Sequence, residues 1–149
     1  MSIIISIDEI KKQIPEYKPE HSEKVHKQAV TKANKKFEVA LKESKLKQVI
    51  LMCGGSASGK TEFLSEYLKD TDAIIFDGTL PSIQGAEIKL SKTIKAKKKP
   101  IICFVYPENF KIAFEAFLNR DRKFGDEHFY RTHSGSRKQF YGLREIIQK

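Results

Sequence analysis

The chain has 149 residues, a length that suits one domain with its own core but is short for a three-layer nucleotide-binding fold. Its formal charge of +9, from 28 Lys and Arg against 19 Asp and Glu, predicts a surface that attracts nucleotide phosphates or nucleic acid. Cys53 and Cys103 lie in apolar runs without metal-ligand spacing, so we expect reduced core residues. No stretch approaches the roughly 20 apolar residues of a membrane span, and no secretory leader precedes residues 2–7, so we expect a cytoplasmic protein without membrane contact.

The first 46 residues predict a helical N-terminal extension. Residues 2–7 fit either a short edge strand or an apolar lead into a helix capped by Ser6, and the capping-box spacing to Glu9 favours the second interpretation. Residues 20–43 then predict a long helix whose apolar stripe packs on the α/β body or on a partner: Val25, Ala29, Ala33, Phe37 and Leu41. Its other face carries lysines that we interpret as solvated, with nucleic-acid binding as the alternative: Lys24, Lys27, Lys32, Lys35, Lys36 and Lys42.

Residues 54–61 match the phosphate-binding P-loop pattern G-x-x-x-x-G-K-[ST] at every fixed position. The strand-like run 48–53 precedes them and the helix-like run 62–68 follows, which is the context that the motif requires. We expect Lys60 to reach the β- and γ-phosphates of ATP and Thr61 to ligate Mg²⁺. The predicted nucleotide-binding residues of the loop are Gly54, Gly55, Ser56, Ala57, Ser58, Gly59, Lys60 and Thr61.

The remainder of the chain alternates strands with helices. Strands are predicted at 73–77 and 101–106, and helices at 83–96, from Pro107, at 126–131, and from a break at Ser134-Gly135-Ser136 to the last residue. This alternation predicts one doubly wound α/β domain, a three-layer P-loop kinase fold with a small parallel sheet in the body 47–149. Strand 48–53 would then be central, with ligands bound where the strands end.

Charged residues follow two of these strands. Asp77 ends a strand, and the sequence leaves three roles open for it: a turn cap, a Mg²⁺ ligand through water, or the base that positions an attacking hydroxyl. Four arginines follow the third strand, where phosphoryl-transfer enzymes often supply guanidinium groups: Arg120, Arg122, Arg131 and Arg137. His128 and His133 have no partner at ligand spacing, so we expect surface residues.

Together, the P-loop, Asp77-Gly78-Thr79-Leu80-Pro81-Ser82, Asn119-Arg120-Asp121-Arg122 and Tyr130-Arg131-Thr132 resemble the zeta-toxin family of P-loop kinases over residues 48–137. The resemblance implies ATP and Mg²⁺, phosphorylation of the 3′-hydroxyl of UDP-N-acetylglucosamine as in the studied members, and an antitoxin as protein partner. By this resemblance Asp77 matches an acidic residue before Gly-Thr, and Arg120 and Arg131 match two lid arginines. Arg122 joins the predicted nucleotide-binding residues.

One departure from the family concerns the acceptor. In the family, a long segment between the P-loop helix and the acidic-Gly-Thr strand contributes a further strand, the aspartate taken as base, and most of the sugar-nucleotide pocket. Here Lys60 and Asp77 are only 17 positions apart, which leaves no room for such a segment. We therefore expect a nucleotide half without an acceptor half, and no phosphorylation of UDP-N-acetylglucosamine at an enzyme-like rate.

These observations predict an ATP-dependent kinase whose hydroxyl acceptor is unidentified, with Lys60, Asp77, Arg120 and Arg131 as catalytic residues and Thr61 and Asp77 at the metal. Two alternatives remain open. The positive charge also fits a nucleic-acid-associated NTPase or polynucleotide kinase. The helix at 20–43 also fits a non-catalytic ATP-binding switch that docks a partner.

Overall fold

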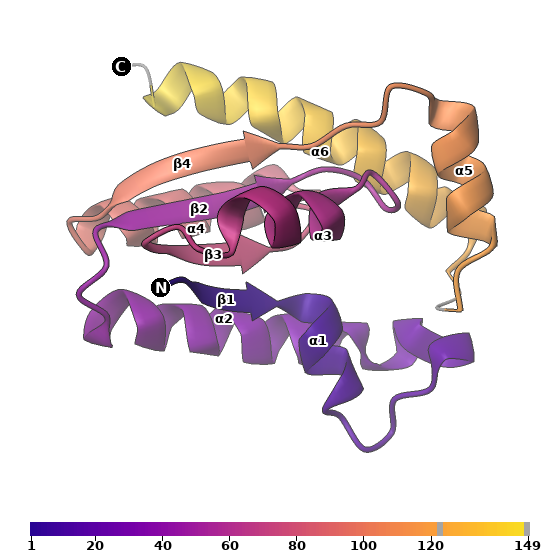
Figure 1. Ribbon diagram of the computed structural model, residues 1–149, viewed down its shortest axis with the longest axis horizontal. Coiled ribbons are helices and arrows are strands. Elements are labelled where there is room, and N and C mark those ends of the chain that lie inside the picture. Colours follow the sequence, from indigo (N-terminus) through magenta and orange to yellow (C-terminus); the bar gives the residue numbers. More distant parts are fainter. Residues whose placement is uncertain (122–123, 148–149) are drawn as a thin grey trace.

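The computed structural model describes residues 1–121 and 124–147. Its centre is a four-stranded parallel sheet with helices on both faces (Figure 1). The strands are β1 (Ile3–Ser6), β2 (Gln48–Cys53), β3 (Ala73–Asp77) and β4 (Lys99–Phe104), in the order β1-β3-β2-β4. As predicted, β2 lies between β3 and β4, so the glycine-rich loop that follows it emerges from the middle of the sheet.

The helices are α1 (Ile7–Lys12), α2 (His26–Glu43), α3 (Lys60–Phe63), α4 (Ile83–Lys95), α5 (Phe110–Leu118) and α6 (Asp126–Ile147). A 3₁₀ segment, η1 (Pro19–Val25), precedes α2, and a π-helical turn, η2 (Leu64–Leu68), continues α3. Figure 1 shows α3 in front of the sheet and α4 behind it, so the architecture is compatible with three layers. None of the helices in the described ranges combines the length and apolar character that a membrane span requires.

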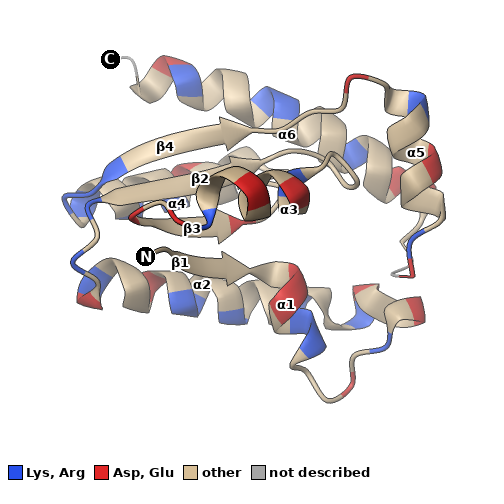
Figure 2. Ribbon diagram, viewed as in Figure 1, with Lys and Arg blue, Asp and Glu red and all other residues tan. Residues whose placement is uncertain are grey.

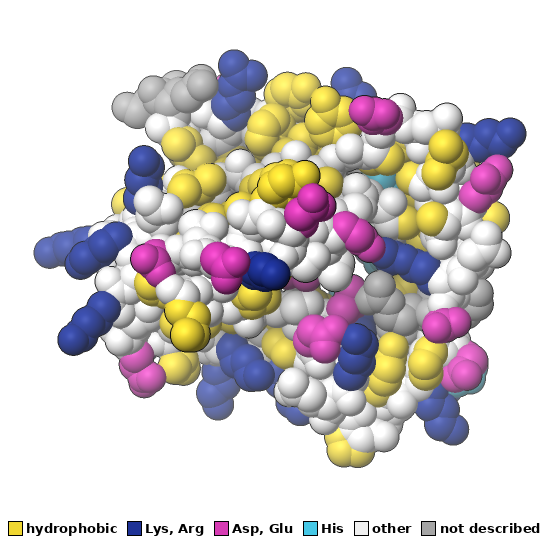
Figure 3. Space-filling model, in the orientation of Figure 1, with side chains coloured by type: hydrophobic (Ala, Val, Ile, Leu, Met, Phe, Trp, Pro, Cys, Tyr) yellow, Lys and Arg dark blue, Asp and Glu magenta, His cyan; other side chains and the backbone are white. Residues whose placement is uncertain are grey.

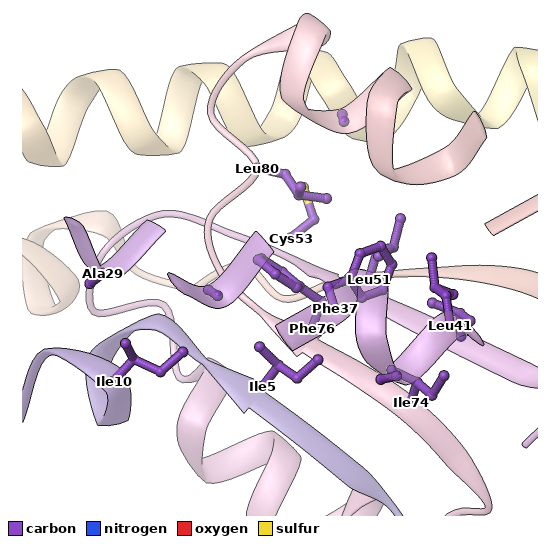
Figure 4. Packing of buried hydrophobic residues seen from close by; sticks show 14 of the residues in the cluster. Ile5, Ile10, Ala29, Phe37, Leu41, Leu51, Cys53, Ile74, Phe76 and Leu80 are labelled. Atoms are coloured by element: carbon purple, nitrogen blue, oxygen red, sulfur yellow. The ribbon is translucent and has the colours of Figure 1, made fainter. Parts of the chain in front are cut away.

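The main core lies between the sheet and the layer formed by α2, α4 and α6 (Figure 4). Because successive strand residues point to opposite faces, Val49 and Leu51 face this core while Ile50 and Met52 pack against η2 on the other face. The ring of Phe37 on α2 meets Phe76 edge to face at 5.5 Å. The predicted apolar stripe of residues 25–41 is buried here, and each large apolar side chain of that kind stabilises the fold by roughly 1.5–3 kcal/mol.

The N-terminal segment belongs to the body of the fold, so the predicted helical extension is corrected. β1 pairs in parallel with β3, with Ser6 opposite Asp77, and Ile5 is buried in the main core. Ser6 also caps α1, because its Oγ accepts the N–H of Glu9 at 3.5 Å. Both interpretations of residues 2–7 therefore hold: an edge strand ends at the residue that starts a capped helix.

Two predicted boundaries shift for local reasons. β4 begins before Pro100, which the sheet tolerates because β4 is an edge strand and proline removes one ladder donor. α5 begins at Phe110, three residues after Pro107, because the Asn109 side chain caps it. The Asn109 Oδ1 accepts the N–H of Lys111 at 2.9 Å and that of Ile112 at 3.2 Å.

Helix α6 is continuous, so the predicted break at Ser134-Gly135-Ser136 is wrong. A glycine occupies position 135 of the helix because the loop before α4 passes close beside it. A Cβ atom on Gly135 would overlap the carbonyl group of Pro81. The neighbouring Ser136 donates its hydroxyl to the carbonyl oxygen of Thr79 in the same loop. The glycine therefore serves a close backbone approach and does not end the helix.

We expect Gly135→Ala to destabilise the protein by about 1–3 kcal/mol, because the added methyl group must displace the backbone at Pro81. Gly142→Ala in the same helix is the matched control, since its Cβ would meet Ile83 Cδ1 at an ordinary 3.7 Å. Helix propensity alone should then stabilise the control by up to about 1 kcal/mol. Urea unfolding midpoints measure both variants, and equal stabilities would contradict the close approach.

Candidate functional site

The glycine-rich loop 54–61 connects β2 to α3 in an unusual backbone conformation. Ala57 and Gly59 both adopt positive φ, at 57° and 89°, and such conformations cluster at functional sites. Gly54 passes so close to the residue after β4 that a Cβ atom would overlap the carbonyl oxygen of Val105. The Oγ of Ser58 is buried and finds no hydrogen-bond partner among the described residues. A polar group left in this way suits a ligand that accepts a hydrogen bond.

Lys60 directs its ammonium group back into the loop. Its Nζ donates to the carbonyl oxygens of Gly54 at 2.9 Å and Gly55 at 3.0 Å. Burial lowers the pKa of Lys60 to about 8, although the carboxylate of Asp77 acts in the opposite direction. The loop therefore encloses one cation whose charge is costly without an anion, and a phosphate oxygen would compensate that cost.

Side chains of helix α6 hold the glycine-rich loop in place through hydrogen bonds to Ser56. The Ser56 N–H donates to Thr132 Oγ1 at 3.1 Å, and His133 Nε2 donates to the Ser56 carbonyl oxygen at 2.8 Å. The His133 ring fills the space that a Cβ atom on Gly55 would need. Burial lowers the pKa of His133. His133 is thus a half-buried support of the loop, and the prediction of a surface residue is wrong.

A hollow of about 70 Å³ lies against the loop and gathers most of the predicted site. It brings together residues from the loop, from the end of β3 and from the segment after α5. The predicted residues that line it are Ser56, Ala57, Ser58, Lys60, Thr61, Asp77 and Arg120. Gly54, Gly55 and Gly59 shape the loop without lining the hollow.

Part of the lining of this hollow comes from the N-terminal segment. Asp8 and Lys11 on α1 line the hollow, together with His26 at the start of α2. The Lys11 side chain is only 2% exposed, and its Nζ lies 3.6 Å from Asp8 Oδ1. Lys11 Nζ also donates a hydrogen bond to Ser22 Oγ at 3.3 Å. Its ammonium group also lies 4.6 Å above the ring of Phe124. A second buried lysine therefore lines the hollow besides Lys60.

Asp8 reaches the site because β1 and β3 end side by side. Ser6 is opposite Asp77 in the sheet, so α1 begins next to the carboxyl end of β3 and carries Asp8 toward the loop. The available signal in the sequence was the acid two residues after a possible strand. It was weak, because nothing in the sequence pairs residues 3–6 with residues 74–77.

Two histidines, His26 of α2 and His128 of α6, line the hollow, and burial lowers the pKa of both. Burial lowers the pKa of His128 to about 4, and burial together with the charge of Lys11 lowers the pKa of His26. The His26 Nδ1 atom is buried and has no hydrogen-bond partner within the described ranges. His128 was predicted as a surface residue, but it lines the hollow. Both rings pack edge to face against each other at 6.4 Å.

A larger cavity of about 690 Å³ lies next to the hollow and shares four lining residues with it: Asp8, Thr61, Asp77 and Arg120. The rest of its lining comes mainly from the N-terminal segment, including Ser6, Lys12 and Tyr17. The interval between Lys60 and Asp77 contributes only Thr61 and Leu64 to this cavity. The cavity therefore depends mainly on residues that precede the loop in the chain.

The predicted arginines do not all reach the site. Arg120 lines both cavities. Arg131 is exposed on α6, where its Nη2 donates to His128 Nδ1 at 3.3 Å, and it lines a neighbouring hollow with Glu23 and His26. Arg131 thus contacts a lining residue of the hollow without lining it. Arg122 lies outside the described residues.

Thr61 and Asp77, the predicted metal ligands, line the same two cavities. A hydroxyl and a carboxylate are oxygen donors of the kind that Mg²⁺ prefers. Within the described ranges, no group of three or more His, Cys, Asp or Glu side chains could hold a metal ion by itself. A metal here would therefore need further oxygen ligands from phosphate and water, as Mg²⁺ usually has.

We expect nucleotide affinity to fall as pH rises from 7 to 9, because Lys60 has a pKa of about 8 and only its charged form attracts phosphate. Lys60→Arg is the control, since a guanidinium group stays charged throughout this range. Titration of Mg-ADP at pH 7, 8 and 9 by calorimetry measures the affinity. A wild-type affinity as independent of pH as that of Lys60→Arg would contradict the assignment.

Neither the known protein-family models nor the curated proteins that we searched match this chain.

Proposed function

We propose that the chain is an ATP-dependent phosphotransferase that phosphorylates a hydroxyl acceptor held by its N-terminal segment. The observation that carries this proposal is the convergence of Lys60, Asp8 and Asp77 on one hollow that continues into a larger cavity. A cation enclosed by a glycine-rich loop suits the phosphates of a nucleotide. Two carboxylates beside it suit a metal ion and a reacting hydroxyl.

The loop residues would hold the phosphates of ATP. Lys60 would exchange its bonds to two loop carbonyls for phosphate oxygens, and Ser58 Oγ would gain the partner that it lacks. Thr61 and Asp77 would hold Mg²⁺ through their oxygen atoms. ATP would supply the phosphoryl group: the acceptor oxygen bonds to the γ-phosphorus, the bond to the bridging oxygen breaks, and ADP leaves.

We propose Asp8 as the base, so that Asp77 takes the role of the metal ligand. Both carboxylates line both cavities, and we assign Asp77 to the metal because it ends β3, the neighbour of the strand that leads into the glycine-rich loop. We assign Asp8 to the acceptor because its α1 neighbours Glu9 and Lys12 line the larger cavity, and Lys11 compensates its charge. Its carboxylate would accept the proton of the acceptor hydroxyl as the oxygen attacks.

The geometry also bears on the resemblance to zeta toxins. The family has a further strand followed by the aspartate taken as base, and the sequence analysis found no room for either after the glycine-rich loop. Here β1 lies beside β3 and leads to Asp8, from the other end of the chain. We propose that the acceptor half precedes the loop in this chain. Under this proposal the missing segment gives no reason to exclude UDP-N-acetylglucosamine. That compound therefore belongs among the acceptors to be tested.

The lysine-rich face on which the nucleic-acid alternative was based lies outside the candidate site. The lysine-rich face of α2 and η1 is exposed, but none of its lysines lines either cavity within the described residues. A polynucleotide kinase would need cations along the path of the nucleic acid into the site.

The experiment that tests the proposal incubates the protein with γ-labelled ATP, Mg²⁺ and a cell metabolite extract, with UDP-N-acetylglucosamine in a parallel reaction. Mass spectrometry then identifies the labelled molecule. We expect one hydroxyl compound to gain a phosphoryl group. Label released only as inorganic phosphate, at the same rate with and without acceptors, would identify a simple NTPase instead. Failure to bind Mg-ATP would remove the proposal.

We expect Arg120→Ala to lower the transfer rate about 10³-fold with less effect on ATP affinity, because a guanidinium group at this place neutralises charge that develops on the transferring phosphate. Arg120→Lys should restore little activity, since lysine lacks the planar fork. Arg131→Ala is the matched control and should retain near wild-type rates, because Arg131 lies outside both cavities. Equal losses in the two alanine variants would contradict the placement.

A further inference from the structure

β1 is an edge strand of the sheet, and α2 runs alongside it (Figure 1). β1 pairs with β3 on one side, and no other strand of the described residues pairs with it on the other side. An edge strand presents unpaired N–H and C=O groups, and natural proteins usually protect such edges with charges, proline or bulges. β1 has none of these: its sequence is Ile-Ile-Ile-Ser, and Ile3 and Ile4 are 38% and 44% exposed.

A groove of about 810 Å³ runs between this edge and α2. Its floor is apolar, because the three isoleucines of β1 meet Ala40 and Val39 of α2, and Val39 is 45% exposed. Ser44 and Glu43 lie at the end of the groove where α2 stops. An apolar groove beside unpaired backbone groups has the chemistry that a further β-strand would bind.

The rim of the groove is positively charged. Lys32, Lys35 and Lys36 of α2 line it, against the single carboxylate of Glu43. All three lysines are exposed, and none takes part in an ion pair among the residues with described positions. Figure 2 shows the Lys and Arg positions on α2 in blue, and Figure 3 shows dark blue side chains along the lower left margin, where α2 runs.

The positive charge of the rim distinguishes two possible occupants of the groove: a second copy of the chain and an acidic segment of another protein. A second copy of the chain would bring its own three lysines toward the same groove and would add a formal charge of +9 to a charge of +9. Like charges brought together in this way oppose association. A segment with acidic side chains would instead complement the rim while its backbone completes the edge.

We propose that the β1 edge and its groove bind an acidic, extended segment of a partner protein as a fifth strand of the sheet. Apolar side chains at alternate positions of that segment would enter the groove, and acidic side chains would face Lys32, Lys35 and Lys36. The segment needs only a few extended residues, since β1 itself has four. The groove shares no lining residue with the hollow at the glycine-rich loop, and its only lining residue in common with the larger cavity is Ile4, so the proposal does not depend on the proposed function.

The test uses a labelled peptide of four Glu-Val repeats and a control peptide of four Lys-Val repeats, with fluorescence anisotropy as the readout. We expect the wild-type protein to bind the acidic peptide and not the basic one, more weakly as salt rises. Hydrogen exchange should then slow at residues 3–6. No binding of the acidic peptide at millimolar concentration, or binding without this protection, would overturn the proposal.

Two sets of variants make the test specific. Ile4→Lys places a charge on the exposed edge, and Lys32→Glu with Lys35→Glu and Lys36→Glu reverses the rim; each should raise the Kd at least tenfold. Lys24→Glu with Lys27→Glu and Lys42→Glu is the matched control, with the same charge change outside the groove. Equal effects of the two triple variants would overturn the proposal, as would dimerisation of the wild type that Ile4→Lys abolishes.

Discussion

Replacing Lys60 with alanine should lower phosphoryl transfer by at least about 10²-fold and weaken ATP binding. The loop encloses the Lys60 ammonium group, which bonds only to the Gly54 and Gly55 carbonyl oxygens among the described residues. Removing one preorganised donor from a site of developing charge typically costs 10²–10³-fold in rate. Single-turnover transfer from γ-labelled ATP, together with calorimetric titration of Mg-ADP, separates the rate from the affinity.

Lys98→Ala is the matched control for this experiment. Lys98 resembles Lys60 in donating its Nζ to two backbone carbonyl oxygens, those of Ser44 and Leu46. It precedes β4, at the opposite end of the sheet from the loop, and lines neither cavity. Its removal should cost stability without changing the affinity or the rate of the folded protein. Wild-type binding and turnover in Lys60→Ala would remove the phosphate-binding role of the loop.

The second large effect is expected at Asp8, a residue that the sequence analysis did not select. We expect Asp8→Asn to lower the transfer rate about 10²- to 10⁴-fold, because an amide cannot accept the proton of the acceptor hydroxyl. ATP affinity should change less than the rate, since we assign Asp8 to the acceptor and not to the phosphates. Ser22→Ala is the control: it removes the other partner of Lys11 and leaves the carboxylate in place. A loss of rate in Ser22→Ala equal to that in Asp8→Asn would show that Asp8 acts only by holding Lys11.

The dependence on Mg²⁺ concentration distinguishes the two carboxylates. Asp77→Asn should also lose most turnover, and it should shift the Mg²⁺ midpoint upward, because we assign Asp77 to the metal together with Thr61. Asp8→Asn should remain slow at saturating Mg²⁺ with an unchanged midpoint. The reverse pattern would exchange the two roles.

The local sequence was sufficient to predict the elements that carry the candidate site. The spacing of the glycines with Lys60 and Thr61, and the continuous apolar runs on either side, predicted a strand, a loop and a helix that the structure contains. The four-residue spacing from Val25 to Leu41 predicted the buried face of α2. Such patterns are readable because they depend on residues close in the chain, through the alternation of a strand or the turn of a helix.

Tertiary structure alone decided what completes the site. The pairing of Ser6 with Asp77 brings Asp8 to the loop, and no local pattern encodes a pairing between strands some 70 residues apart in sequence. Gly135 was predicted to break a helix, because the sequence does not show that the carbonyl group of Pro81 lies against it. His133 was predicted to be a surface residue, because its bond to Ser56 joins α6 to a loop far away in sequence. A contact between distant segments is selected by packing and by the burial of shared surface. The sequence thus determined the phosphate-loop motif, and only the folded chain determined which residues face it.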